Sequence, residues 1–324
     1  LFAAAVAALG LNQGVRWQFY GLYAFIGIVG SVAGQVLMTK LVAGWFDRSR
    51  GLFLGIVGGI GNGAGATAMP FYVQYLIQDQ GWRAGYFGVG AAIAILSIPA
   101  VLFLLRDPPR QAPGQQDGEA TDHADEAGTP WRAALRTPTF WLILVAIGAG
   151  AGGMTGAFTH VVPIMLDKGF ALGPATKVLS LFAFVTVAWQ ITIGAMLDRF
   201  PIPRLAAPFF LIAAIGTVVM QESALYPSLL FSAALLGIGL GTAYGVLPYF
   251  LSRYFGLRDY GTISGFIYGV VTLVQGFTPF LMDAVFDEMG SYRWAMVGVA
   301  ASLFLSSVLV LRLRPFPFMQ KESV

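Results

Sequence analysis

Long apolar runs alternate with short polar breaks along most of the chain. A helix needs about 20 apolar residues to cross a bilayer. Nine runs approach or exceed that length: Trp17–Phe46, Gly51–Ile77, Trp82–Leu105, Phe140–Leu166, Pro174–Leu197, Leu205–Met220, Pro227–Leu251, Gly261–Phe286 and Trp294–Leu313. The shorter run Leu1–Leu11 is interpreted as the end of a helix whose beginning is missing, so we expect a sequence truncated at its N-terminus. The pattern predicts an all-α integral membrane protein.

One polar segment interrupts the series of apolar runs. Residues 106–136 are rich in Pro, Gly, Gln, Asp and Glu, and such a composition cannot bury enough apolar surface to fold alone. We therefore predict a flexible linker at 106–136 between two helical halves, 1–105 and 137–314, followed by a tail at 315–324.

Composition agrees with a lipid environment. Hydrophobic residues make up 57% of the chain and charged residues 11%, and the mean hydropathy is +0.72. Soluble domains carry about 25% charged residues. The chain has no cysteine, which excludes disulfides and thiolate metal sites. We expect no metal, no cofactor and no nucleic-acid partner.

Basic residues in the short loops predict the orientation in the membrane. Alternate connections form two sets, and the set on the linker side is the richer in Arg and Lys, with thirteen residues against four. Loops rich in Lys and Arg stay in the cytoplasm. This asymmetry predicts a protein of the cell (inner) membrane whose linker and C-terminus are cytoplasmic.

The two helical halves repeat a local pattern. The stretch Trp82–Gly90 and the stretch Tyr292–Ala300 both begin with an aromatic residue and Arg, and both continue as a Gly-containing apolar run. Parallel repeats of this kind are a known plan of secondary transporters.

Several motifs resemble the major facilitator superfamily. The stretch Gly194–Arg199 with Arg204 resembles the cytoplasmic loop motif of that family. The stretches Trp45–Leu52, Gly81–Arg83 and Phe286–Tyr292 resemble its monocarboxylate and oxalate/formate antiporter branch. The resemblance implies a two-half helical bundle in which about ten of twelve transmembrane helices are present, with family helices 3–6 in the first half and 7–12 in the second.

The resemblance also implies a function. We expect a secondary active transporter, not an enzyme, that moves a small organic solute by alternating access, driven by a gradient and with a co-transported proton or ion. A monocarboxylate is favoured by the resemblance, whereas the shortage of basic residues in Pro174–Leu197 and Gly261–Phe286 argues against a dianion. Two alternatives stay open, namely a non-transporting sensor on the same scaffold and a membrane enzyme that uses Asp283 and Asp287 to hold Mg²⁺ and a diphosphate.

Polar side chains inside apolar runs are candidates for a substrate site. Amides and phenols can bind a carboxylate or a hydroxyl without the cost of burying a charge. The alternative for each is a hydrogen bond between helices. The cavity candidates are Gln35, Asn62, Tyr72, His160, Gln190, Tyr244, Tyr268 and Gln275.

Two residues are candidates for coupling to an ion. His160 is the histidine that lies within an apolar run, and a histidine side chain ordinarily titrates near pH 6.5, so it could carry a proton with the substrate. A neutral, hydrogen-bonded imidazole is the alternative. Lys40 could neutralise an anionic substrate, or its ammonium could reach back to the interface.

Charged loop residues are candidates for a cytoplasmic gate. Asp198, Arg199 and Arg204 would hold neighbouring helix ends together, with Asp47, Arg48 and Arg50 as the partner cluster. A simple orientation signal is the alternative.

A glycine stripe predicts close helix packing. Gly51, Gly55, Gly59 and Gly63 recur every four residues on one helix face. They do not form a nucleotide loop, because no Lys-Ser/Thr pair follows them.

Overall fold

The computed structural model describes residues 1–32, 50–104, 128–256 and 258–317, and these are almost entirely helical. Helices occupy the described part of each of the nine predicted apolar runs, so the all-α membrane class is confirmed. In the described part of the chain, seven helical segments are long and apolar enough to cross a membrane: Trp82–Phe103, Pro138–Asp167, Leu172–Arg199, Pro203–Glu222, Tyr226–Phe255, Tyr260–Met289 and Arg293–Leu311.

Contacts divide the chain into two compact units. The first holds residues 1–45 and 65–113, and the second holds residues 46–64 and 114–324. Helix α4 (Arg50–Gln80) contributes its first half to the second unit and its second half to the first. The division into two halves around a linker at 106–136 stays a prediction.

The first unit contains α1 (Phe2–Ala8), the 3-10 turn η1 (Leu9–Leu11), α2 (Arg16–Val32), the end of α4 and α5 (Trp82–Leu104). Helix α1 lies against α5 at Gly90, where a Cβ atom would come within 2.8 Å of the Ala3 carbonyl oxygen. Gly81 ends α4 with φ +82°, a left-handed conformation that glycine adopts at low cost.

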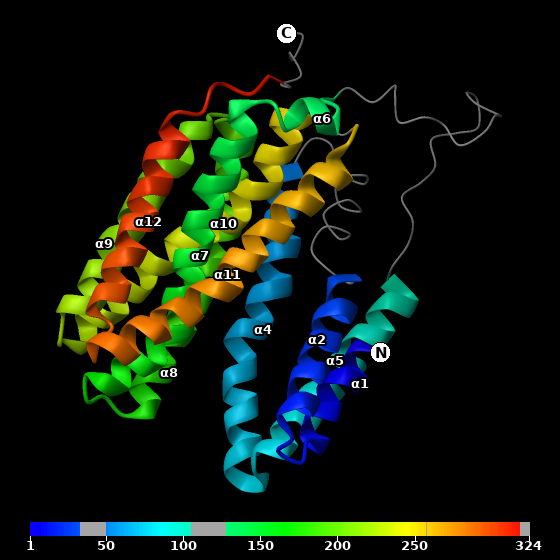
Figure 1. Ribbon diagram of the computed structural model, residues 1–324, viewed down its shortest axis with the longest axis vertical. Coiled ribbons are helices and arrows are strands. Elements are labelled where there is room, and N and C mark those ends of the chain that lie inside the picture. Colours follow the sequence, from blue (N-terminus) through cyan, green and yellow to red (C-terminus); the bar gives the residue numbers. More distant parts are fainter. Residues whose placement is uncertain (33–49, 105–127, 257, 318–324) are drawn as a thin grey trace. The chain divides into compact units, whose positions relative to one another are not determined.

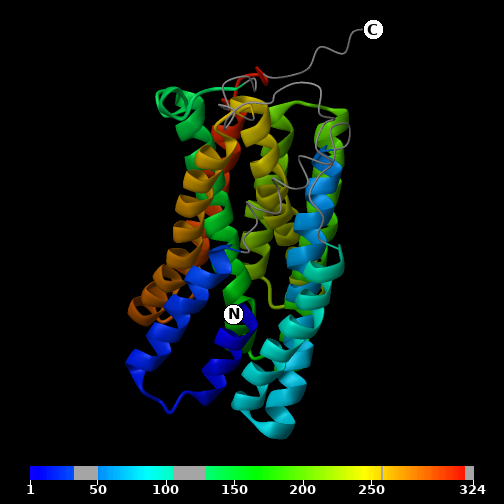
Figure 2. The ribbon, with the colours of Figure 1, turned by 90° about the vertical axis from the view of Figure 1, so that its right-hand side faces the viewer.

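The second unit contains the start of α4 and the helices of the second half of the sequence. These are α6 (Trp131–Ala134), α7 (Pro138–Asp167), α8 (Leu172–Arg199), η3 (Pro203–Ala206), α9 (Ala207–Glu222), α10 (Tyr226–Phe255), α11 (Tyr260–Met289) and α12 (Arg293–Leu311). Green α7 lies between orange α11 and red α12 and contacts both, while α8 and α9 each pack on α10 (Figures 1 and 2).

Glycines let α8 and α10 approach closely. A Cβ at Gly237 would lie 2.8 Å from the Phe182 carbonyl oxygen, and one at Gly241 would lie 2.6 Å from the Thr186 carbonyl oxygen. Small residues at this spacing allow backbone contact between membrane helices. This second glycine stripe was not singled out from the sequence.

The short helix α6 stands at the end of the segment predicted to be a linker. The Trp131 backbone N–H donates to Asp259 Oδ2 at 2.7 Å, and the Thr129 N–H donates to the Phe255 carbonyl at 2.7 Å. Residues 128–136 are therefore held against the connection between α10 and α11.

Candidate functional site

Three helices of the second unit bring hydrogen-bonding side chains together. Gln275 on α11 places its Nε2 3.0 Å from Thr155 Oγ1 on α7 and 3.0 Å from the Tyr244 hydroxyl on α10. All three side chains are half-buried. The cluster joins two predicted cavity residues, Tyr244 and Gln275, with Thr155, which sequence reasoning did not select.

The direction of these hydrogen bonds determines which protons remain available. The Gln275 amide N–H groups donate, so the oxygens of Thr155 and Tyr244 act as acceptors. Each hydroxyl still carries one O–H that can donate elsewhere. The cluster can therefore present two neutral donors to an oxygen-rich ligand.

Tyr268 lies two helical turns before Gln275 on α11. Its hydroxyl oxygen is buried and has no hydrogen-bond partner among the described residues. Residues seven apart lie close to the same face of a helix. Tyr268 therefore adds an unsatisfied polar group to the face of α11 that carries Gln275.

A second polar contact joins α7 and α11 nearer their C-terminal ends. His160 Nε2 lies 2.8 Å from Asp283 Oδ1. The other ring nitrogen, Nδ1, lies 2.8 Å from the Gly156 carbonyl oxygen and 3.1 Å from Thr159 Oγ1. The imidazole is buried, with 4% of the residue exposed, whereas 61% of the Asp283 side chain is exposed.

Aromatic rings cover one side of this pair. The Tyr292 ring centroid lies 5.4 Å from that of His160, and Phe286 stacks on Tyr292 at 4.3 Å. Burial raises the pKa of the Tyr292 phenol, and the nearby carboxylates of Asp283, Asp167 and Asp287 raise it further. Three carboxylates therefore act on the Tyr292 phenol at this end of the bundle.

Gln190 and Tyr72 lie apart from these contacts. Gln190 on α8 is 2% exposed, and its carbonyl oxygen would lie 2.9 Å from a Cβ at Gly55 and 3.1 Å from one at Gly245. Tyr72 belongs to the first unit, where its exposed hydroxyl lies 3.5 Å from the Gly88 carbonyl oxygen, too far for a strong hydrogen bond.

Several predicted site residues lie outside the part of the chain that the structure describes. Gln35, Lys40, Asp47 and Arg48 lie outside the described residues. Four further predicted residues belong to helix α4, and only their backbone is described: Arg50, Gly51, Asn62 and Gly63.

The predicted gate residue Asp198 contacts the start of α4. Its Oδ2 accepts a hydrogen bond from the Leu52 backbone N–H at 2.9 Å. Negative charge at a helix N-terminus is favourable, because the first backbone N–H groups have no partner within the helix. Arg199 lies over the Phe200 ring at 5.5 Å, and Arg204 lies in η3.

Glycines bring α4 and α8 close together beside this contact. Cβ atoms at Gly55 and Gly59 would lie 2.9 Å from the Gln190 carbonyl oxygen and 3.2 Å from that of Val187.

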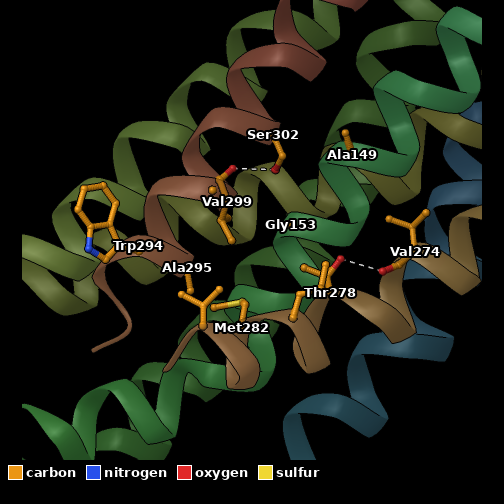
Figure 3. A pocket seen from close by; sticks show the side chains of 12 residues that line it. Ala149, Gly153, Val274, Thr278, Met282, Trp294, Ala295, Val299 and Ser302 are labelled. Carbon is orange, nitrogen blue, oxygen red and sulfur yellow. Dashed lines mark hydrogen bonds between the residues drawn. The ribbon is translucent and has the colours of Figure 1, made fainter. Parts of the chain in front are cut away.

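A separate groove of about 320 Å³ lies among α7, α11 and α12 (Figure 3). Its lining is mainly apolar and includes Val274, Met282, Trp294 and Val299. The hydroxyls of Thr278 and Ser302 each donate to a carbonyl of their own helix, at 2.8 Å in both cases. The groove therefore offers little to a polar solute.

The described residues hold no group of three or more His, Cys, Asp and Glu side chains that could bind a metal ion. Asp283 contacts His160, whereas the enzyme alternative required it to act with Asp287.

Comparison with known proteins identifies the class. The sequence matches the profile of the Major Facilitator Superfamily over residues 1–268 and 178–323. The fold is similar to the crystal structure of FucP, a Major Facilitator Superfamily transporter in the outward conformation, with a TM-score of 0.63 and 14% identity over 96% of this chain and 79% of that chain.

Two curated relatives are similar in sequence. The Nitrite extrusion protein of Bacillus subtilis (strain 168) is 23% identical over 89% of this chain and 69% of the relative. Monocarboxylate transporter 11 of Homo sapiens is 25% identical over 90% of this chain and 61% of the relative. The chain thus spans less than two thirds of the length of the human relative.

The apolar helical bundle and these similarities define an integral membrane protein of the secondary-transporter class. The chain belongs to the Major Facilitator Superfamily, and it resembles the monocarboxylate branch. Members of this family bind and move small molecules and are not enzymes.

Proposed function

We propose that the complete protein carries a small organic monocarboxylate across the cell membrane by alternating access. The observation that carries this proposal is the cluster of Gln275, Thr155 and Tyr244, in which three helices converge on hydrogen-bonding side chains. Transporters of this kind bind their solute between helices near the middle of the membrane.

The chemistry of the cluster suits an anion with a single charge. Two hydroxyl donors can bind one carboxylate, and they do so without a buried ammonium or guanidinium group. The curated relatives are named for nitrite and for monocarboxylates, which are small oxyanions of one charge. A neutral site with several donors would favour such anions over dianions, whose second charge would remain uncompensated.

The contact between Asp198 and Leu52 supports a gating step. It joins the end of α8 to the start of α4 through the hydrogen bond from the Leu52 N–H to Asp198 Oδ2, at a helix N-terminus. We propose that this contact closes the cytoplasmic side of the carrier and breaks when that side opens. Arg199 and Arg204, with Asp47, Arg48 and Arg50, would complete the gate.

The same proposal includes the arrangement of the carrier in the membrane. The two halves, 1–105 and 137–314, would move about a central site, with the linker 106–136 and the tail 315–324 in the cytoplasm. The solute would travel with a proton or another ion, so that a gradient supplies the energy.

Counterflow tests the proposal. The full-length protein would be reconstituted into proteoliposomes loaded with one unlabelled solute, and entry of the labelled solute would be followed for lactate, pyruvate, oxalate, a hexose and a cationic drug. We expect entry of the monocarboxylates and little entry of oxalate. Vesicles without protein are the control.

Exchange of none of these solutes would contradict the proposal. If binding of a solute were still detected by calorimetry in that case, the result would favour a sensor on the same scaffold.

A further inference from the structure

We propose that His160 and Asp283 together form a proton-binding site that couples transport to the proton gradient. The inference deepens the proposed transport function and rests on it. The site consists of one buried imidazole on α7 and one exposed carboxylate on α11, at 2.8 Å.

Every partner of the imidazole accepts a hydrogen bond. Nδ1 faces the Gly156 carbonyl oxygen at 2.8 Å, and a carbonyl can only accept. The neighbouring Thr159 hydroxyl has the carbonyl oxygens of Thr155 and Gly156 at 3.1 and 3.0 Å, so its own proton is used within the helix. This geometry favours the tautomer with the proton on Nδ1.

The contact between His160 Nε2 and Asp283 Oδ1 also needs a proton. A neutral imidazole has one N–H, and in this geometry that proton is on Nδ1. Nε2 would then point a lone pair at a carboxylate oxygen 2.8 Å away. The contact requires one more proton, held either as Nε2–H or as O–H on Asp283. The pair thus binds one proton more than a neutral histidine beside an ionised aspartate.

Loss of that proton would open the contact between the two helices. The Nε2 lone pair and the carboxylate oxygen would then repel each other at 2.8 Å. Pro163 lies one turn further along α7 and lacks the N–H that would bond the preceding turn, so the helix is easier to bend there. Proton occupancy is therefore linked to the spacing of α7 and α11.

Other charged and polar groups lie at this end of the bundle. Besides Asp283, the carboxylates of Asp287 and Asp167 act on this end of the bundle, as does the phenol of Tyr292. Two cations lie near these carboxylates: Arg293 is paired with Glu222 at 3.4 Å, and Lys168 interacts with Asp167 and Glu222 while its Nζ donates to the carbonyl oxygens of Gln221 and Ser223. The exposed Asp283 side chain gives the proton a path to water.

Transport measurements separate coupling from substrate binding. His160→Gln and Asp283→Asn would be compared with the unaltered full-length protein for uptake driven by a pH gradient and for counterflow, which needs no net proton movement. We expect gradient-driven uptake to fall much further than counterflow in both variants. Glu288→Gln, which removes a carboxylate from the same end of α11, is the matched control and should keep both activities.

Spectroscopy tests the proton count without reference to transport. In a His123→Asn background, nitrogen NMR of the single labelled histidine and carbon NMR of labelled Asp283 would be followed from pH 5 to pH 9, a range around the ordinary value of about 6.5 for histidine. We expect one proton to leave the pair in a single step seen by both labels. In Asp283→Asn this joint step should disappear.

The outcomes distinguish this inference from the proposed function. If the unaltered protein moved no solute, the transport proposal would fail, while the NMR titration would still decide whether the pair binds a proton. A neutral imidazole beside an ionised Asp283 throughout the pH range would overturn the proton site, as would gradient-driven uptake that survives in both variants.

Discussion

At the scale of single residues, the hydroxyl groups of the second unit fall into two kinds. Thr278 and Ser302 donate to carbonyls of their own helices, which leaves them no free proton for a ligand. Thr155 and Tyr244 instead receive hydrogen bonds from Gln275 on another helix, which leaves their O–H groups available. The difference separates a polar site from the apolar groove beside it.

Substitution of Thr155 tests the role of its hydroxyl. Thr155→Val keeps the side-chain volume but removes one donor, and a hydrogen bond to a charged ligand contributes about 1.5–3 kcal/mol. We expect the KM for the monocarboxylate to rise by roughly tenfold or more, since about 1.4 kcal/mol equals tenfold in affinity.

The control for this substitution is Thr278→Val on α11, whose hydroxyl bonds to its own helix. Initial rates of counterflow at varied solute concentration measure both. An unchanged KM in Thr155→Val would remove this residue from the site.

Residue type alone predicted part of the site. Gln275, Tyr244 and His160 stand out because amides, phenols and imidazoles are rare in apolar runs. Thr155 does not stand out, because threonine in a helix usually bonds to its own backbone. Asp283 lies near a helix end, where a solvated charge is the ordinary interpretation, and only its contact with His160 indicates otherwise.

At the scale of helices, close backbone approach decides which elements pair. Helix α10 meets α8 through Gly237, Gly241 and Gly245, and α8 meets the start of α4 through Gly55 and Gly59. In lipid, such contacts depend on shape, because the hydrophobic effect does not favour one apolar neighbour over another.

A methyl group on Gly241 should destabilise the pair of helices. The added Cβ would lie 2.6 Å from the Thr186 carbonyl oxygen and 2.9 Å from the Gln190 backbone nitrogen, which cannot move aside like a flexible side chain. Overpacking of this kind costs about 1–3 kcal/mol. We expect Gly241→Ala to lower the Tm in detergent.

Gly269→Ala on α11 is the control, because no described atom outside its own stretch of α11 lies within 4 Å of the added Cβ. Alanine favours a helix over glycine by up to about 1 kcal/mol, so its Tm should stay the same or rise. Equal Tm values for the two variants would contradict the packing argument.

Lys168 ties the α7–α8 connection to the end of α9. Its Nζ donates to the carbonyl oxygens of Gln221 at 2.6 Å and Ser223 at 2.9 Å. Cations near a helix C-terminus stabilise its last carbonyls. We expect Lys168→Met, which keeps the aliphatic chain, to lower the Tm by an amount equivalent to about 1 kcal/mol at neutral pH.

The contribution of Lys168 to the free energy of unfolding should depend on pH in a defined direction. Burial lowers the pKa of Lys168 below its model-compound value, and Glu222 and Asp167 offset part of the effect. Folding therefore disfavours the protonated form of Lys168. The free energy of unfolding should rise as pH increases from the lowered pKa toward 10.5, because the unfolded state binds the proton more tightly there. Unfolding curves of both proteins across the alkaline range check the sign, and Lys168→Met should not show this rise.

At the scale of the whole molecule, alternating access requires helices that part and close again. The contact of Asp198 with the N-terminus of α4 is suited to this because a hydrogen bond and a charge–dipole interaction at a helix end can break and form again in each cycle. The packed glycine contact beside it would separate at the same time.

Neutralising Asp198 should shift the carrier toward the state in which α4 and α8 are apart. Asp198→Asn removes a charge–dipole interaction of about 0.3–1 kcal/mol, which corresponds to roughly a two- to fivefold change in population. The chain has no cysteine, so Ile191→Cys gives a single label site on α8 where Gly55 approaches it.

We expect faster maleimide labelling of that cysteine in the Asp198→Asn protein, measured in membranes. Glu222→Gln, on α9, serves as the control and should leave the rate unchanged. No change with Asp198→Asn would argue against the gate.

The sequence by itself determined the class of protein and the places of its helices. Transfer of apolar residues into lipid is a local property that adds up along each run, so a window of about 20 residues predicts a span. The loop motifs likewise indicated the family. Tertiary structure decided which polar groups meet: His160 and Asp283 lie 123 positions apart, and Thr155 and Gln275 lie 120 apart. Those contacts depend on helix rotation and close packing between distant segments, which no single run encodes.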